Sequence, residues 1–383
     1  MSINVAVSLD LNLGLTRYTM MYKGIQDYAK EHTDWSLFWD HYPEIKLKQS
    51  SKSSPAYSGI IGRIKFNAYD EAKRLDIPCV NLWLNSDLAS EIPSVLTDFK
   101  EAGKLSAKHL INRGFKEITL IDFMDKATIA FIEGMNEIMK PMKYKIKKYR
   151  FNRTAPESPA AWEKQMATFE TWTKEWTFPM AVASSGLNAA IPTFCKSLGI
   201  RIPEDLALIM CGMQTSLFET MDPHITSVDP NFWQQGYEAA KMLDLQLQGK
   251  KLVDREIFIQ PKGIVPRAST DTYATEDKIV RDALRFIADN IDRALQVSDV
   301  VQHLPVSRSS LENRFKDATG TTIKEEINRL MVISAKRLLS DEKMKIKEVH
   351  LKAGFSSALH LRRIFKKHTG MTPGEFRKSL NQG

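Results

Sequence analysis

Residues 307–320, SRSSLENRFKDATG, and residues 357–370, SALHLRRIFKKHTG, are two copies of one pattern. When the chain is shifted by 50 positions against itself, eight of the twenty residues from 311 to 330 are matched by an identical residue. The identical pairs are Leu311/Leu361, Phe315/Phe365, Lys316/Lys366, Thr319/Thr369, Gly320/Gly370, Thr322/Thr372, Glu325/Glu375 and Leu330/Leu380. This internal repeat predicts that the C-terminal region contains one structural unit twice.

Each unit reads as two short helices joined by a tight turn. The predicted helices are 297–304 and 307–318 in the first copy, and 346–353 and 356–367 in the second. Residues four apart lie on one helix face, so Leu311 and Phe315 should be buried together, as should Leu361 and Phe365. A connecting helix between the copies should bury Ile327, Leu330, Met331, Leu338 and Leu339.

The opposite face of each second helix is then exposed. It carries Arg308, Ser309, Glu312, Asn313 and Lys316 in the first copy, and Ala358, Leu359, Arg362, Arg363 and Lys366 in the second. A unit that buries its first helix and exposes the polar face of its second has helix-turn-helix geometry, in which this face enters the major groove of double-stranded DNA. The alternative is a solvated face on an ordinary helical bundle.

Charge is distributed unevenly along the chain. Residues 276–383 contain 21 Lys and Arg against 14 Asp and Glu, whereas residues 1–275 contain 33 against 32. The basic C-terminal segment favours a polyanionic partner, although surface lysines scattered evenly would give the same sum.

Several C-terminal stretches resemble the double helix-turn-helix domain of AraC-type transcription regulators. They are SRSSLENRFKDATG (307–320), AKRLL (335–339) and IKEVHLKAGFSSALHLRRIFKKHTGMTPGEFRK (346–378). The resemblance covers about the last hundred residues, and it implies double-stranded DNA and RNA polymerase as partners.

The N-terminal region alternates short β-rich apolar runs with helical patterns, which is typical of a parallel sheet with crossover helices. The predicted strands are 3–9, 59–61, 79–82, 94–97, 118–123, 180–183 and 206–210, and the predicted helices are 18–30, 100–112, 127–139, 187–198 and 232–247. In such a fold, binding loops follow the carboxyl ends of the strands. The polar stretch 267–275 precedes a capped helix start at Glu276 and Asp277. We therefore divide the chain into a domain at 1–270, a linker at 271–276 and a helical domain at 277–383.

The first domain resembles the sugar-binding core of lactose-repressor-type regulators, which is related to periplasmic binding proteins. The resemblance lies in TDFKEAGKLSAKHLINRGFKEITLI (97–121), LGIRIPEDLALI (198–209), ITSVDPNFWQQGYEAAKML (225–243) and IVPRAST (264–270). It implies an α/β fold of two lobes that close on a small effector. The order of the two domains is similar to that of bacterial xylose-operon activators, and it implies a sugar-like effector and a homodimer.

The chain departs from this family at polar positions. Ser184 and Ser185 stand where an Asn-Asp pair is usual, Met213 stands where an Asp is usual, and Pro230 replaces a frequent polar contact. Unmatched sugar hydroxyls are costly, so we expect xylose to bind poorly. The candidate effector contacts are Asp10, Asn12, Thr16, Arg17, Asp98, Ser184, Ser185, Gln214 and Asp229, for which the alternative is ordinary loop polarity or a helix cap. Sugar-stacking candidates are Trp83, Phe123, Trp162 and Trp233, which could instead be core residues.

Other functional classes have little support. No apolar run has the length of a membrane span, and no secretion leader is recognisable, so we expect a cytoplasmic protein. Cys79, Cys195 and Cys211 form no CxxC motif, and we expect them to be buried. We find no nucleophile elbow, phosphate loop or metal-ligand spacing, and we expect no enzymatic activity, cofactor or metal. Three hypotheses stay open: an effector-responsive regulator, a regulator whose α/β domain has lost its ligand and binds partners, and a DNA-tethered enzyme.

Overall fold

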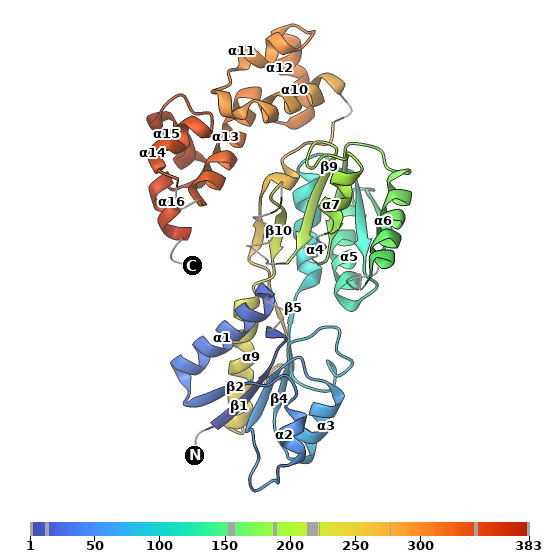
Figure 1. The fold of residues 1–383 in the computed structure, drawn as a ribbon, viewed down its shortest axis with the longest axis vertical. Helices are drawn as coiled ribbons and strands as arrows, with labels where there is room; N and C mark the ends of the chain where they lie inside the picture. The colour runs from blue at the N-terminus through green and yellow to red at the C-terminus, as the bar shows by residue number, and fades with distance from the viewer. Residues whose placement is uncertain are drawn as a thin grey trace.

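The structure is a computed structural model that describes residues 3–11, 15–151, 158–186, 190–212, 221, 223–275, 277–340 and 344–380. Figure 1 shows two α/β lobes and an all-helical domain arranged along the long axis of the molecule. The predicted fold class, a two-lobed α/β domain followed by an all-α domain with two helix-turn-helix units, is confirmed.

The first lobe is built on a parallel six-stranded sheet with the order β11-β5-β4-β3-β1-β2. Its strands are β1 (Ile3–Ser8), β2 (Trp35–Trp39), β3 (Gly59–Gly62), β4 (Cys79–Asn81), β5 (Ser94–Thr97) and β11 (Glu256–Ile259). Its helices are α1 (Thr16–His32), α2 (Glu44–Lys48), α3 (Phe66–Arg74) and α9 (Phe232–Leu247). Alternate residues of β1 point to opposite faces: Val5 and Val7 pack with α1 and α9, and Ala6 packs with α2 and α3.

The second lobe has a similar sheet with the order β12-β10-β9-β8-β6-β7, in which β12 alone runs antiparallel to its neighbour. Its strands are β6 (Glu117–Asp122), β7 (Lys145–Arg150), β8 (Met180–Ser184), β9 (Leu206–Cys211), β10 (Thr226–Asp229) and β12 (Gly263–Val265). The helices α4 (Phe99–Ile111) and α5 (Lys126–Met139) pack on one face, and α6 (Pro159–Thr173) and α7 (Ala190–Ser197) pack on the other.

The chain crosses between the lobes three times: from β5 to α4, from β10 to α9 and from β11 to β12. The crossing segments are bonded to one another, because the Asp98 amide donates to the Ile259 carbonyl at 3.0 Å and the Lys262 amide donates to the Asp229 carbonyl at 2.9 Å. These segments form a hinge beside the carboxyl ends of several strands.

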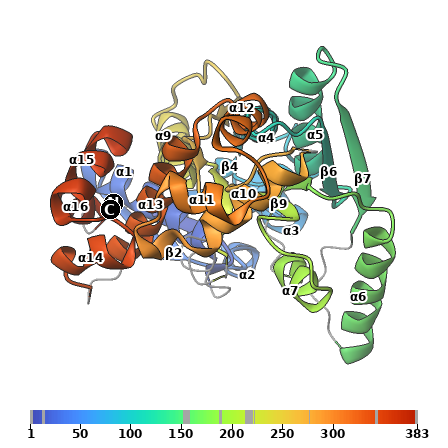
Figure 2. The same cartoon turned by 90° about the horizontal axis from the view of Figure 1, so that it is seen from above.

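The helical domain has one apolar core that contains residues of both repeat copies. Its helices are α10 (Lys278–Asp289), α11 (Val297–His303), α12 (Arg308–Thr319), α13 (Ile323–Ser340), α14 (Ile346–Lys352), α15 (Ala358–Thr369) and α16 (Pro373–Leu380), and a short 3-10 helix, η3 (Ile291–Arg293), follows α10. The connecting helix α13 buries Ile327, Met331 and Leu339, as predicted, whereas the predicted Leu330 and Leu338 are half-buried. Figure 2, which views the molecule from above, shows α13 between α12 and α14.

The sequence repeat corresponds to repeated capping chemistry. The Thr319 and Thr369 hydroxyls each donate to the backbone carbonyl of the buried phenylalanine four residues earlier. Gly320 and Gly370 end α12 and α15 with φ values of 71° and 76°. The carboxylates of Glu325 and Glu375 then accept from the amides of the threonines three residues earlier. The matched polar residues therefore set where each helix ends and the next begins.

The prediction of buried cysteines is confirmed. All three cysteines are buried, and none of them forms a disulfide. Among the described residues, none of the helices has the length and apolar character that a membrane span requires.

Gly354, in the turn between α14 and α15, allows a matched test of backbone constraint. It has a φ of 77°, and a Cβ there would lie 1.8 Å from the Ile291 carbonyl oxygen. Gly370 has a similar φ but open space around it. We expect Gly370→Ala to cost about 1–2 kcal/mol of unfolding free energy through its backbone conformation. Gly354→Ala should cost clearly more, because the chain must also move. Urea unfolding followed by circular dichroism measures both, and equal losses would contradict the steric argument.

Candidate functional site

The polar faces of α12 and α15, which we call the recognition helices, are exposed. All ten predicted contact residues are solvent-exposed, whereas the apolar residues Leu311, Phe315, Leu361 and Phe365 are buried. Leu359 is 76% exposed, which is unusual for a leucine without a partner surface. Within this face, Arg308 Nε donates to the Glu312 carboxylate at 2.9 Å.

The first recognition helix is tied to the start of its own domain. Arg314 of α12 donates from Nε and Nη2 to both carboxylate oxygens of Asp277 at 2.6 Å. Asp277 also caps α10 by accepting from the Ile279 and Val280 amides. The hydrogen bonds from Arg314 hold the pKa of Asp277 below its usual value. Arg314 therefore acts inside the domain and leaves the exposed face to its neighbours.

A cleft with a volume of about 780 Å³ lies between the two lobes, next to the hinge. Its apolar lining includes Leu9, Leu82, Phe99 and Phe232, and the charged residues that line it in the described part of the chain are Arg17, Arg63 and Asp125. The other lining residues are Leu15, Tyr18, Met21, Trp83, Leu84, Asn85, Thr97, Ala127, Ser185, Gly186, Cys211, Gly212, Pro230 and Gln235. The carboxyl ends of β1, β3, β4 and β9 contribute to it, where a fold of this type places ligands.

Of the predicted effector contacts, Arg17 and Ser185 line the cleft. Asp10 does not line the cleft, and its carboxylate oxygens lie 3.0 Å from Arg63 Nη1 and from His41 Nδ1. Thr16 begins α1 without lining the cleft. Asn12 and Gln214 lie outside the described residues, as does Met213.

Three more predicted contacts are used by the protein itself. Asp98 caps α4 through the Glu101 amide and accepts from Gln260 across the hinge. Asp229 accepts from the Asn231 amide at 2.8 Å, and the buried Ser184 hydroxyl donates to the Gly186 carbonyl. At these positions the structural alternative, a cap or an ordinary loop polar group, describes the contacts that are observed.

Sequence reasoning missed four charged or amide side chains that line the cleft: Arg63, Asn85, Asp125 and Gln235. Arg63 directly follows β3, so its position after a strand could have identified it. Gln235 lies inside α9, where it donates to the carbonyls of Leu82 and Val95, and it gives no local signal. Of the aromatic candidates, Trp83 lines the cleft, while Phe123, Trp162 and Trp233 pack against other side chains.

Among the described residues, two side-chain contacts bridge the lobes at the cleft. Asn85 Nδ2 of the first lobe donates to Asp125 Oδ2 of the second at 3.3 Å. Lys126 Nζ donates to the Ser86 carbonyl at 3.0 Å. The two lobes therefore hold each other at this edge through few and exchangeable bonds.

The segment between the α/β domain and the helical domain is packed against both of them. It is preceded by a 3-10 helix, η2 (Ala268–Thr270), in which the Ser269 hydroxyl donates to the Leu208 carbonyl of β9. Arg113 at the end of α4 donates to the Thr270 carbonyl and accepts, through its own carbonyl, from the Ala274 amide. The segment is thus fixed to the second lobe rather than free.

A buried charge cluster joins the same segment to α13. Arg329 donates from Nη1 to Asp271 at 2.8 Å, and from Nε and Nη2 to both oxygens of Glu326. The Asp271 side chain is 6% exposed and that of Glu326 is 1% exposed. Tyr273 completes the cluster by donating to Glu326. Removing one partner from such a group leaves an uncompensated buried charge, which costs about 3–5 kcal/mol.

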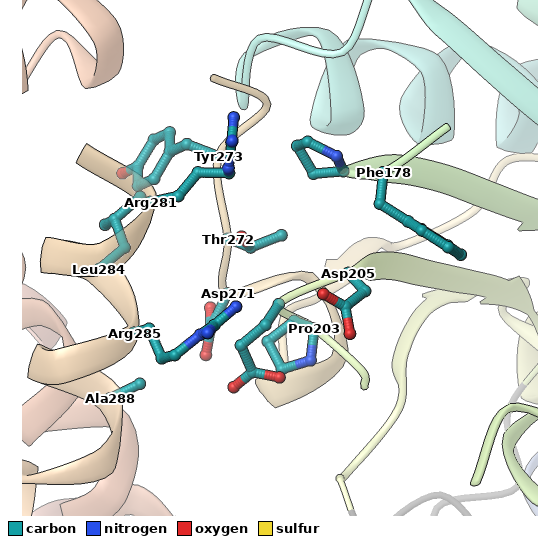
Figure 3. Close-up of a pocket in the computed structure, with 12 residues that line it drawn as sticks. Phe178, Pro203, Asp205, Asp271, Thr272, Tyr273, Arg281, Leu284, Arg285 and Ala288 are labelled. Carbon is teal, nitrogen blue, oxygen red and sulfur yellow. The ribbon is translucent and has the colours of Figure 1, made fainter. Parts of the chain in front are cut away.

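Figure 3 shows this junction from the side of α10, with Leu284, Arg285 and Ala288 facing Pro203 and Asp205 of the second lobe. The linking segment, residues 271–273, runs between them. A cavity of about 80 Å³ remains here, so the helical domain and the second lobe are close neighbours with little room for a ligand. In the part of the chain that is described, no group of His, Cys, Asp and Glu could hold a metal.

Comparison with known proteins finds two family models. Residues 107–270 match the periplasmic binding protein-like domain, and residues 300–379 match a helix-turn-helix domain. The two matches lie in the order that the sequence analysis predicts.

Known proteins match most of the chain. The chain is 26% identical over 299 residues to the xylose operon regulatory protein of Haemophilus influenzae, covering 76% of each chain. It is 24% identical over 368 residues to the protein of that name from Escherichia coli K12, covering 93% of this chain and 92% of the relative. A solved structure described as a xylose-binding transcription activator superposes with a TM-score of 0.72 at 21% identity, over 99% of this chain and 98% of that one.

The junction generates a pH prediction through His109, whose Nε2 lies 2.9 Å from the Thr270 hydroxyl. Burial, together with the charge of Arg113, lowers the pKa of His109 to about 3. An unfolded histidine has a pKa of about 6.5, so below that pH the unfolded state binds a proton that the folded state does not. We expect His109 to remove about 2 kcal/mol of unfolding free energy between pH 7 and pH 5.

The variant His109→Gln keeps a side chain that can bond to Thr270 and does not titrate. Its unfolding free energy, measured with urea, should fall less than that of the parent over the same pH range. An identical fall in both proteins would contradict the assignment of a neutral, buried imidazole.

Proposed function

We propose that this chain, an AraC-type helix-turn-helix transcription regulator with a periplasmic binding protein-like domain, changes its activity on DNA when a sugar-like effector binds between its lobes. The observation that supports this most directly is the combination of two exposed recognition helices on one core with a cleft at a hinge. Homologous chains are regulators and not enzymes, and the same holds here.

We assign DNA contact to the ten exposed residues of the recognition helices. Both helices belong to one rigid core, so they would enter successive major grooves about 34 Å apart, on one face of the duplex. Arg362 and Arg363 can each donate two hydrogen bonds to a guanine edge, and Asn313 can pair with adenine. Lys316 and Lys366 suit the phosphate backbone.

We assign the effector to the cleft. The relatives are named for the xylose operon, and the superposed activator is described as xylose-binding. In this chain Ser184 bonds to its own loop and Pro230 has no donor, so fewer groups are free for a pentose. The effector we propose is therefore sugar-like but different from xylose.

A second candidate function is regulation without a small ligand, in which the α/β domain binds a partner or a second copy. It is favoured by the largely apolar lining of the cleft and by the internal use of Asp98 and Asp229. The effect of sugars on DNA affinity separates the two candidates.

Further assignments complete the proposal. The domain limits are 1–270, 271–276 and 277–383, the assembly is a homodimer that contacts RNA polymerase, and the protein works in the cytoplasm, where its DNA is. An effector changes DNA affinity only through its different affinities for the open and closed lobes, typically by about 1–3 kcal/mol. Lobe closure would rearrange the dimer and so reset the spacing of its DNA-binding domains.

Arg363 tests the DNA assignment. Arg363→Ala should weaken binding to the preferred site by about 1–3 kcal/mol and relax the choice of base at one position. Arg293→Ala is the control, because Arg293 is exposed in the same domain but belongs to η3 and not to a recognition helix. Binding would be measured by fluorescence anisotropy on a set of single-base variants. An equal loss on every sequence would make Arg363 a phosphate contact.

The effector assignment is tested on the full chain. A sugar that raises the melting temperature by binding the folded α/β domain should also change affinity for the preferred DNA site by a factor of about 5–150. Thermal-shift screening followed by anisotropy measures both quantities. DNA affinity that is indifferent to every sugar would support the ligand-free candidate instead.

A further inference from the structure

Two guanidinium groups lie in the cleft at the ends of neighbouring strands. β1 and β3 pair in parallel with Ser8 opposite Gly62, and the Arg63 amide donates to the Ser8 carbonyl at 2.8 Å. Arg17 lies in the first turn of α1, which follows β1. Both side chains line the cleft, so it is lined by two cations.

Arg17 is a cation with little internal compensation. Its Nη2 donates to the Tyr18 hydroxyl at 2.9 Å, and its Cζ lies 4.5 Å from the centre of that ring. Its buried Nε has no hydrogen-bond partner among the described residues, and none of their carboxylates lies within 4.0 Å of it. A cation in the first turn of a helix also opposes the helix dipole. Such a group is expected to have an anion as its partner.

Arg63 is held in a fixed orientation. Its Nη1 donates to Asp10 at 3.0 Å, and its Cζ lies 3.9 Å from the centre of the Trp83 ring. Asp10 is shared with His41, and the buried Nε of Arg63 has no hydrogen-bond partner among the described residues. A guanidinium that is stacked and anchored at one nitrogen loses little entropy when its remaining donors bind a carboxylate or phosphate.

The acidic residue of the lining does not balance these groups. Asp125 accepts from the amide and hydroxyl of Thr128 at 2.8 Å, and from Asn85 at 3.3 Å. Its charge therefore serves as the cap of α5 and as the bridge between the lobes. Helices α1 and α9 both begin beside the cleft. Neither has a side-chain cap or an acidic residue in its first turn.

From these contacts we infer that the effector carries an anionic group, a carboxylate or a phosphate, which Arg17 and Arg63 bind together. This inference rests on the proposed function, because it takes the cleft as the effector site. The sugar-like part of the molecule would pack on the apolar lining, which includes Leu9, Leu82 and Phe99. The effector class is a sugar acid or a sugar phosphate.

Calorimetry on the full chain tests the inference with matched ligands: glucose, gluconate, glucuronate and glucose 6-phosphate. We expect at least one anionic member to bind at least about tenfold more tightly than glucose, as an added charge-assisted hydrogen bond provides. The carboxylates and the phosphate distinguish the two sources of charge. If glucose binds as tightly as the anionic sugars, or if none of the anionic sugars binds, the inference is overturned. A neutral sugar that binds and changes DNA affinity would leave the proposed function standing.

Inorganic phosphate is a probe that does not depend on the identity of the sugar. Millimolar phosphate should raise the melting temperature of the parent protein, and Arg17→Gln should abolish this rise. Arg17→Gln removes the hydrogen bond to the Tyr18 hydroxyl, so the rise is measured against the melting temperature of the same variant without phosphate. Lys73→Gln, an exposed position on α3 outside the cleft, is the matched control and should keep the rise. A phosphate effect that survives in Arg17→Gln would overturn the assignment.

Discussion

The arrangement of the whole molecule depends on the buried ion cluster of Arg329, Asp271 and Glu326. Charges buried this deeply are tolerated only when each has its partner in good geometry. Asp271 comes from the segment that follows the second lobe, whereas Glu326 and Arg329 come from α13. The cluster therefore fixes the orientation of the helical domain relative to the α/β domain. Helix α13 in turn connects the two repeat copies, one at each of its ends.

Several polar side chains near the hinge are used by the protein itself. The carboxylates of Asp98 and Asp229 accept hydrogen bonds from backbone amides, and Asp98 also accepts from Gln260. These bonds stabilise the crossings between the lobes. Arg17 keeps donors that the described residues do not use. Polarity at a cleft rim is thus a weak guide to ligand contact, and the state of each hydrogen-bonding group is a better one.

Much of the fold could be predicted from sequence, because its signals are local. The apolar spacing of Leu311 with Phe315 defines a helix face without further information, and the repeat transfers that result to the second copy. Strands β2, β7, β10, β11 and β12 are absent from the predicted strands. Four of them are edge strands, which carry weaker burial patterns, whereas β10 lies between β9 and β12. Gln235 could not be found for a different reason: its role depends on α9 packing against two strands that lie far away in sequence.

The chain leaves the α/β domain from its second lobe, to which Ser269 and Arg113 fasten the segment that follows. The second lobe and the helical domain would therefore stay together as one rigid unit when DNA is bound. The first lobe would then be the part that moves. It is attached by the three crossings and by hydrogen bonds such as that between Asn85 and Asp125. Binding in the cleft would then move the first lobe relative to the rest of the protein. The displacement would be greatest at the end of the molecule farthest from the DNA.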